Sequence, residues 1–161
     1  MNKKLIDVII LIAIIGFILL WFAPRGNAIT EAEDDFARSE TYWLTLNIYH
    51  EARGEHPFGM LMVALVTLDR QDDGRWGDTI KEVVTAPAQF SWYSDGKSDI
   101  PTDEESWELS KKVALFAQMT YSSFGDHFNV THYHALSVSP YWKDELERAL
   151  VFGNHVFYRE G

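Results

Sequence analysis

Cysteine is absent from the 161 residues of this sequence, which excludes a disulfide framework, a thiolate metal site and a cysteine nucleophile. Basic residues are scarce as well, because 14 Lys and Arg stand against 24 Asp and Glu, for a net charge of −10 at pH 7. No Lys/Arg-rich tract interrupts this acidic character. An acidic surface repels phosphate groups, so we expect no nucleic acid partner.

Internal repeats and low-complexity tracts are also lacking, and 47% of the residues are hydrophobic and 14% aromatic. This is enough apolar material to form a folded core, and it argues against disorder. A length of 161 residues fits one domain with an appendage, since domains centre on about 100–150 residues. We therefore expect a single functional site.

The long apolar run of the sequence covers residues 5–23, interrupted only by Asp7. At ~1.5 Å per residue a helix of this length nearly crosses a hydrocarbon core of about 30 Å, and it exceeds the ~7–15 residues usual for a cleaved signal peptide. Residues 1–25 are therefore predicted to be a transmembrane or signal-anchor segment in the inner membrane. Lys3 and Lys4 favour a cytoplasmic N-terminus, which places the remaining chain outside the cytoplasm, in the periplasm. A released or secreted form is the alternative.

Residues 26–40 are polar and acidic and are predicted to be a linker, followed by a folded domain over residues 41–161. Apolar positions predict a helix over residues 40–51. A second helix over residues 57–70 is apolar almost all round, so we expect it at the centre of the core, with Pro57 in its first turn.

The second half of the chain predicts a short helix over residues 78–85 and then an aromatic loop of a kind that often binds ligands. Thr102 and Glu105 match a capping box ahead of a long helix through about residue 121. Residues 130–136 and 154–158 are rich in β-branched and aromatic side chains and predict two short strands. The predicted fold class is α+β, mostly helical with a small β element.

Glu51 is the main candidate for chemistry, within Tyr49-His50-Glu51-Ala52-Arg53-Gly54-Glu55. A carboxyl group at a helix end, just before a hydrophobic helix, can be partly desolvated, which raises its pKa and lets it donate a proton near neutral pH. A cation at Arg53 would oppose this unless Arg53 pairs with Glu55 or another acid. The alternative interpretation is an exposed helix end with an Arg–Glu ion pair.

A zinc site is the second hypothesis, because His50-Glu51 begins an H-E-x-x-H pattern. The pattern is incomplete, since position 54 is glycine. His132 and His134 are two apart on a predicted strand and would face the same side, where they could bind zinc with His50 or His155. A packing or hydrogen-bonding role fits these histidines better, so we expect no metal and no other cofactor. The serines lack the G-x-S-x-G context of a hydrolase nucleophile.

Several stretches between about residues 42 and 158 match one family in order and spacing. They are Tyr49 to Glu55, Gly59, Leu68-Asp69-Arg70, Thr79 to Val84, Gln89-Phe90-Ser91, Thr131 to His134, and Gly153 to Tyr158. Together they resemble the SleB/CwlJ family of cell-wall hydrolases. No single stretch is decisive, but their joint order makes the resemblance specific.

The resemblance implies a lysozyme-like domain that cleaves the β-1,4 bond between N-acetylmuramic acid and N-acetylglucosamine in peptidoglycan glycan strands, as a lytic transglycosylase. It implies that Glu51 is the catalytic acid and then the base that helps the muramic 6-hydroxyl close an anhydro ring, with no second carboxylate. Arg53 and Glu55 are expected to support the site. The residues expected in the substrate groove are Gln89, Phe90, Ser91, His132 and Tyr133.

The sequence departs from the spore-germination members of that family, which usually carry a cleaved signal and a separate peptidoglycan-binding repeat domain. A small wall-degrading domain behind an anchor-like segment resembles phage lysis enzymes tethered to the inner membrane, so a role in phage-mediated host lysis is a hypothesis. We expect a monomer. Two alternatives stay open: a zinc-dependent wall amidase or peptidase using His50, His132 and His134, and a non-catalytic membrane-anchored peptidoglycan-binding protein.

Overall fold

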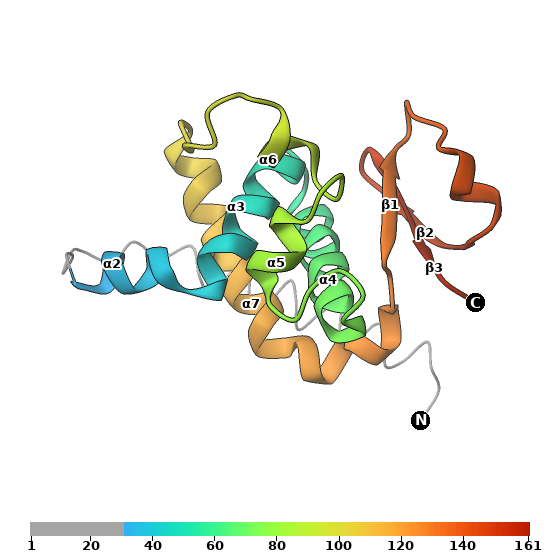
Figure 1. Ribbon diagram of the computed structural model, residues 1–161, viewed down its shortest axis with the longest axis horizontal. Coiled ribbons are helices and arrows are strands. Elements are labelled where there is room, and N and C mark those ends of the chain that lie inside the picture. Colours follow the sequence, from blue (N-terminus) through green and yellow to red (C-terminus); the bar gives the residue numbers. More distant parts are fainter. Residues whose placement is uncertain (1–30) are drawn as a thin grey trace. The chain divides into compact units, whose positions relative to one another are not determined.

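The computed structural model describes residues 31–161, apart from the side chains of residues 31–34 and 124–127. Residues 34–161 form a compact unit. It is mostly helical with a small three-stranded sheet, which confirms the predicted fold class (Figure 1). Within residues 31–161 no helix has the length and hydrophobicity needed to cross a membrane. The predicted anchor, residues 1–25, lies outside the described residues.

The first three helices are α2 (Glu31–Arg38), α3 (Glu40–Ala52) and α4 (Pro57–Asp73). Helix α2 falls in the segment expected to be a linker. Ser39 separates α2 from α3, and its hydroxyl accepts a hydrogen bond from the Tyr42 backbone N–H at 3.2 Å, which satisfies one of the free donors of the α3 N-terminus. The predicted boundaries of α3 and α4 hold to within three residues.

Helix α4 forms the centre of the core, as its all-apolar sequence predicts. It packs against α3, α5 (Ile80–Thr85) and α7 (Glu104–Phe128). Pro57 occupies its first turn, and Gly74 ends it in a left-handed conformation with φ 76°. Its fully buried side chains include Met60, Met62, Val63, Ala64 and Val66. Because α4 is enclosed on several sides, the polar residues near its C-terminal end lie in a desolvated environment.

Helix α7 begins at Glu104 and runs seven residues beyond the predicted end at residue 121. The capping box expected at Thr102 and Glu105 is wrong. Asp103 fills the capping position, since its Oδ1 accepts a hydrogen bond from the Ser106 backbone N–H at 2.7 Å. The Tyr49 hydroxyl accepts hydrogen bonds from the Thr102 and Asp103 N–H groups, each at 3.0 Å, and so ties the start of α7 to α3.

The sheet has the order β1-β3-β2, with both pairs antiparallel. Its strands are β1 (His132–Ala135), β2 (Glu147–Phe152) and β3 (His155–Arg159), and a 3₁₀ helix, η1 (Tyr141–Asp144), lies between β1 and β2. Strands β1 and β3 match the two predicted strands. Strand β2 was not predicted, and its pairing with β3 is irregular between Arg148 and Leu150.

Strand β1 is fastened to the end of α4 by two consecutive residues, Asp69 and Arg70. The Val130 backbone N–H donates a hydrogen bond to Asp69 Oδ2 at 2.6 Å, and Arg70 Nε donates one to the Thr131 carbonyl at 2.8 Å. Both side chains are 6% exposed. Figure 1 shows the resulting arrangement, with the sheet beside α4. Two buried charged residues therefore fix the position of β1 relative to the helices.

Candidate active site

Glu51 lies in the last turn of α3, and Tyr133 from β1 reaches it from the sheet. The Tyr133 hydroxyl donates a hydrogen bond to Glu51 Oε2 at 2.6 Å. Both residues are partly exposed. The bond occupies one of the two carboxyl oxygens of Glu51, which also lines a pocket described below.

Burial raises the pKa of the Glu51 carboxyl above its ordinary value of 4.5, because the charged form loses hydration. The hydrogen bond from Tyr133 and the positive charge of Arg70 act in the opposite direction and lower it, but burial is the larger effect. Tyr133 itself is held neutral, because burial and the nearby Glu51 charge raise the pKa of its hydroxyl well above 10. The pair thus consists of a carboxyl that keeps its proton above the usual pH and a hydroxyl that stays a donor.

Arg70 is the cation that acts on Glu51. Its guanidinium lies between two aromatic rings, with Cζ 5.1 Å from the ring centre of Phe90 and 5.5 Å from that of Trp76. Burial lowers the pKa of Arg70, while electrostatic interactions with Tyr133 and Glu51 oppose that change. An arginine keeps its charge even so. Its Nη1 is fully buried and has no hydrogen-bond partner among the described residues.

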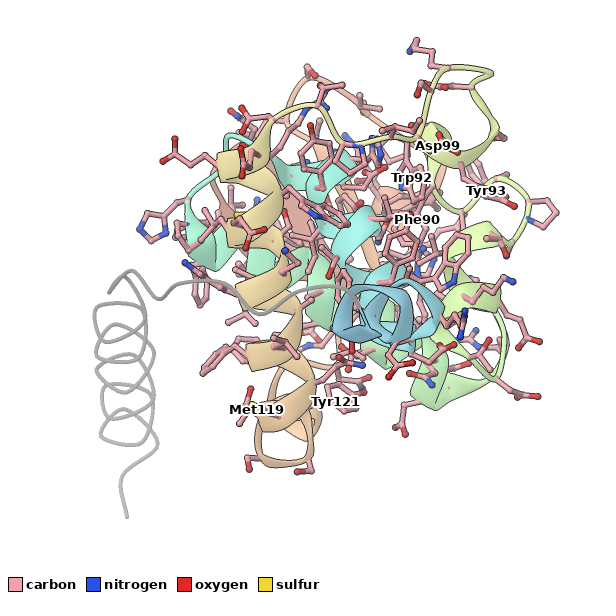
Figure 2. The ribbon with its side chains drawn as sticks, turned by 90° about the vertical axis from the view of Figure 1, so that its left-hand side faces the viewer. Phe90, Trp92, Tyr93, Asp99, Met119 and Tyr121 are labelled. Carbon is pink, nitrogen blue, oxygen red and sulfur yellow. The ribbon has the colours of Figure 1, made fainter. Side chains whose placement is uncertain are left out.

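A pocket of about 440 Å³ opens beside Glu51, between the end of α3 and the segment that joins α5 to α7. Figure 2 shows Trp92, Tyr93 and Asp99 together on that segment, whereas Met119 and Tyr121 lie further along α7. The wall of the pocket is mostly polar and offers carboxylates, hydroxyls and cations. It is lined by His50, Glu51, Arg53, Ser91, Trp92, Asp95, Lys97, Ser98, Asp99, Ile100 and Thr102.

Trp92 is held at this pocket by a buried hydrogen-bond chain. Its indole N–H donates to Asn47 Oδ1 at 2.9 Å, and the Asn47 amide donates to the Thr67 hydroxyl at 2.9 Å. The His50 ring stacks on Trp92, with ring centres 4.5 Å apart and planes 14° apart. His50 Nε2 lies 3.1 Å from the Asp99 carbonyl oxygen, to which it donates in the matching tautomer. These contacts join α3, α6 (Ser91–Ser94) and the loop after it.

The three residues predicted in the aromatic loop have different surroundings. Ser91 is exposed and lines the pocket. Phe90 is only 3% exposed and packs against the Arg70 guanidinium. Gln89 is partly exposed, and its side-chain amide lies 3.5 Å from the Pro87 carbonyl. Of the three, Ser91 is placed to touch a ligand in the pocket, while Phe90 is placed to orient Arg70.

Strand β1 places Tyr133 and His132 on opposite faces of the sheet, as alternation requires. Tyr133 contacts Phe157 and Glu51, whereas His132 and His134 share the other face with Trp142. His132 Nδ1 lies 2.9 Å from the Thr131 hydroxyl, and burial together with the Arg70 charge lowers the pKa of the ring. The structure therefore brings Tyr133, and not His132, to Glu51.

The histidines proposed as zinc ligands do not lie together. His50 stacks on Trp92 at the pocket, while His134 lies within 3.0 Å of the Tyr158 hydroxyl on the far face of the sheet. Among the side chains that the structure describes, no three His, Asp or Glu groups lie together so that they could hold a metal ion. The geometry gives the zinc-dependent amidase or peptidase no support.

Comparison with protein families adds a match over residues 54–158 to the model of a family described as Cell Wall Hydrolase. The chain belongs to the cell wall hydrolase family. The matched region begins three residues after Glu51, and it includes Arg70, Ser91 and Tyr133. The predicted resemblance to the SleB/CwlJ cell-wall hydrolases is thereby confirmed.

Curated relatives of this cell wall hydrolase include spore cortex-lytic enzymes of Bacillus cereus, which are 22% identical over 134 residues. The match covers 83% of this chain and 49% of the relatives, so the chain spans about half of their length. Two solved structures share its fold. They are the catalytic domain of the germination-specific lytic transglycosylase SleB from Bacillus anthracis and that of the Bacillus cereus SleB protein.

The structural match to the Bacillus anthracis domain has a TM-score of 0.62 and 22% identity, and covers 85% of this chain and 100% of that one. The match to the Bacillus cereus domain has a TM-score of 0.60 and 23% identity, and covers 85% and 95%. At this identity the likeness establishes the fold. The small sheet beside the helices is therefore a shared feature of this cell wall hydrolase and the two SleB domains.

The two residues predicted to support the site, Arg53 and Glu55, both lie just after Glu51. Arg53 is exposed at the C-terminal end of α3, with its guanidinium 5.1 Å from the Tyr49 ring centre. Glu55 Oε1 accepts a hydrogen bond from the Asn154 amide at 2.8 Å. Glu55 therefore links the α3–α4 loop of this cell wall hydrolase to the β2–β3 turn.

Arg70 and Trp92 are the residues of the site that the sequence analysis did not select. The signal for Arg70 is a charged residue within an otherwise apolar helix, which requires a buried partner. The signal for Trp92 is its place in the aromatic loop that was expected to bind ligands. In both cases the residue is visible in the sequence, but the partner that gives it a role is distant along the chain.

Proposed function

We propose that this cell wall hydrolase is a peptidoglycan lytic transglycosylase that cleaves the β-1,4 bond between N-acetylmuramic acid and N-acetylglucosamine, with Glu51 as its acid and base. The main support is the Glu51 carboxyl. It has a raised pKa, accepts a hydrogen bond from a hydroxyl at 2.6 Å and lies on the wall of a polar pocket. The Bacillus anthracis relative is a lytic transglycosylase, which supports the reaction type.

In the first step the protonated Glu51 gives its proton to the glycosidic oxygen while the bond from that oxygen to the muramic C1 breaks. A raised pKa suits this step, because the group must still hold its proton near neutral pH. The Tyr133 hydroxyl stays on Oε2 throughout and stabilises the carboxylate that forms. The released N-acetylglucosamine end leaves with a restored hydroxyl.

In the second step the Glu51 carboxylate takes the proton from the muramic 6-hydroxyl, whose oxygen closes onto C1 to form the 1,6-anhydro ring. No water is consumed, and Glu51 returns to its protonated form. This path needs one carboxyl group, whereas a conventional glycosidase needs two at a fixed separation. Asp95 and Asp99 also line the pocket, but Asp95 is engaged by Lys97 in an ion pair at 2.8 Å.

The pocket wall suits a sugar because it pairs polar groups with a flat aromatic surface. The Ser91 hydroxyl and the Asp99 carboxylate can bond sugar hydroxyls, and the partly exposed His50 ring, stacked on the buried Trp92, offers the flat apolar surface. Sugar rings present hydroxyls at their edges and C–H groups on their faces. A wall with polar groups and an apolar surface can contact both. Two of the predicted groove residues support this proposal, since Ser91 lines the pocket and Tyr133 is bonded to Glu51.

The first experiment is mass spectrometry of purified peptidoglycan digested by the full chain in mild detergent, with Glu51→Gln beside it. Wild-type protein is expected to release muropeptides about 18 Da lighter than hydrolysed ones, as the loss of one water requires, and Glu51→Gln none. Glu105→Gln, the same change at an exposed acid of α7, is the matched control and is expected to act like wild type.

Three other outcomes would contradict the proposed function. Products that carry a free reducing end without the anhydro ring would replace the transglycosylase with a hydrolase. Release by Glu51→Gln at the wild-type rate would remove Glu51 from the chemistry. Binding of peptidoglycan with no soluble product from any variant would leave a wall-binding protein.

We further propose that residues 5–23 anchor the enzyme in the inner membrane, that its domain acts on the periplasmic side, and that it takes part in phage-mediated lysis. The apolar run and the basic residues before it support this location. Membrane fractionation of cells that express the full chain tests it, with a variant lacking residues 1–25 as the control. Recovery of the full chain in the soluble fraction would contradict the anchor.

A further inference from the structure

Arg70 is a buried cation whose position is set by three separate contacts. Its Nε is bonded to the Thr131 carbonyl at 2.8 Å, and its guanidinium lies over the rings of Phe90 and Trp76. The side chain is 6% exposed, so it has lost nearly all of its hydration. Keeping a charge in such a place is costly unless a counter-charge is near. These contacts fix the position of the Arg70 charge.

The Arg70 charge interacts with Glu51, and both side chains are bonded to the same short stretch of chain. Thr131, which accepts the bond from Arg70, is two residues before Tyr133, which donates to Glu51. The same short stretch of chain therefore holds Arg70 on one side and Glu51 on the other. Arg70 Nη1 is fully buried and has no partner among the described residues while Glu51 is engaged with Tyr133. This buried donor therefore has an unsatisfied hydrogen-bonding capacity.

We infer that Arg70 is a positioning residue for Glu51: a buried cation that stabilises the carboxylate left after Glu51 has given up its proton, and so helps Glu51 act as the acid of the first step. This inference rests on the proposed function. Without Arg70 the carboxylate would face burial with only the Tyr133 hydrogen bond to offset it. Glu51 would then hold its proton too strongly to give it up and would be a weaker acid catalyst.

The other charged groups around Glu51 do not take this role. Arg53 is exposed and lies against the Tyr49 ring, and Lys97 is paired with Asp95 in the loop after α6. Asp99 and His50 also face the pocket, where the His50 ring is stacked on Trp92. Burial, Tyr133 and Arg70 are the influences that set the pKa of the Glu51 carboxyl.

The test uses the full chain in detergent and compares wild type with Arg70→Gln. Carbon-13 NMR of the side-chain carboxyl groups follows the titration of Glu51 directly, and the rate of muropeptide release is measured across pH. With the cation gone, the pKa of Glu51 is expected to move further upward, and turnover near neutral pH to fall by about tenfold or more, the scale of one charged partner. The pH at which the rate declines on the alkaline side moves upward with the pKa.

Arg75→Gln is the matched control, because Arg75 is an exposed arginine on the same Trp76 ring, at 4.5 Å, and pairs with Asp73 and Glu160 instead. It should leave the Glu51 titration and the rate unchanged. If Arg70→Gln has the wild-type titration and pH profile while Glu51→Gln is inactive, the proposed function stands and the role of Arg70 is overturned. If Glu51→Gln is active, the proposed function fails, and the NMR titration still decides whether Arg70 acts on Glu51.

A second measurement needs no change at Arg70, which matters if Arg70→Gln does not fold. In wild-type protein the nitrogen-15 resonances of the Arg70 guanidinium are expected to shift with the same midpoint as the Glu51 carboxyl, because coupling between two groups is mutual. In Glu51→Gln that step should disappear. Arg70 resonances that show no step in wild type at the Glu51 midpoint would overturn the inference.

Discussion

The hydroxyl of Tyr133 lies 2.6 Å from Glu51 Oε2, although the two residues are 82 apart in the sequence. The contact joins the end of a helix to the first strand of the sheet, so the environment of the proposed acid depends on how these two parts are assembled. A hydroxyl that stays neutral orients one carboxyl oxygen and leaves the other free. Acidity and orientation are thus controlled through one bond.

Tyr133→Phe removes this bond and keeps the ring packing. The hydrogen bond favours the charged carboxylate, so its loss raises the pKa of Glu51 further and moves the alkaline decline of the rate to higher pH. Because the carboxyl also loses its orientation, turnover is expected to fall by about tenfold or more, as for one hydrogen bond to a charged group. Muropeptide release measured across pH checks both effects. An unchanged pH profile would separate Tyr133 from the acidity of Glu51.

Glu51→Gln is expected to stabilise the folded protein at neutral pH. A carboxyl whose pKa is raised on folding binds its proton more tightly in the folded state, so the stability it contributes is present below 4.5 and is lost as pH rises through the higher folded value. The neutral amide avoids that loss. Urea unfolding should therefore show the variant to be more stable than wild type at about pH 7 and the difference to shrink at about pH 4. Equal stability at both pH values would contradict the raised pKa.

Trp92→Phe tests the hydrogen-bond chain behind the pocket. The change keeps an aromatic ring against His50 but leaves the Asn47 carbonyl oxygen buried without its donor, which is expected to cost about 1–3 kcal/mol in the free energy of unfolding. Tyr93→Phe is the matched control, since this neighbouring ring is 43% exposed, and it should change stability by less than about 0.5 kcal/mol. Equal losses in the two variants would contradict a role for the indole N–H.

Gly153→Ala should destabilise the β2–β3 turn for two reasons. Gly153 has φ 55°, which other residues adopt at a cost of about 1–2 kcal/mol, and an added methyl group would force the flexible Glu55 carboxylate to move aside. Gly96→Ala is the control, because it has φ 75° with open space around it and carries the backbone cost alone. Urea unfolding should show the larger loss for Gly153→Ala, and the excess should vanish in a Glu55→Ala background. An equal loss in both glycine variants would mean that Glu55 does not press against the turn.

The sequence predicted those parts of the fold that have a local pattern. Helices α3 and α4 and strands β1 and β3 follow from runs of apolar or β-branched residues, and Glu51 stood out because of its place at a helix end. Strand β2 was missed because Glu147-Arg148-Ala149-Leu150 carries no strand alternation, and its pairing is irregular at that point. Strand β2 forms because it pairs with the central strand β3, and its own sequence does not indicate this.

The environment of the site could not be predicted in the same way. Arg70 donates a hydrogen bond to the Thr131 carbonyl, 61 residues away, and the sequence near Arg70 does not indicate that partner. The prediction that His132 shares the groove with Tyr133 followed a contiguous motif, whereas strand alternation sends neighbouring side chains to opposite faces. Family motifs group residues along the chain, and the strand then separates them in space.

The strand order β1-β3-β2 has a consequence for the making of the protein. Strand β1 pairs with β3, the last of the three strands to leave the ribosome, and Tyr133 is paired with Phe157 in it. A nascent chain that has emerged only as far as residue 150 already contains Glu51, Arg70 and Tyr133, but it has no central strand to keep the hydroxyl beside the carboxyl. The arrangement around the proposed acid is therefore completed only once β3 has been made, so a chain that stops before β3 carries the residues of the site without their arrangement.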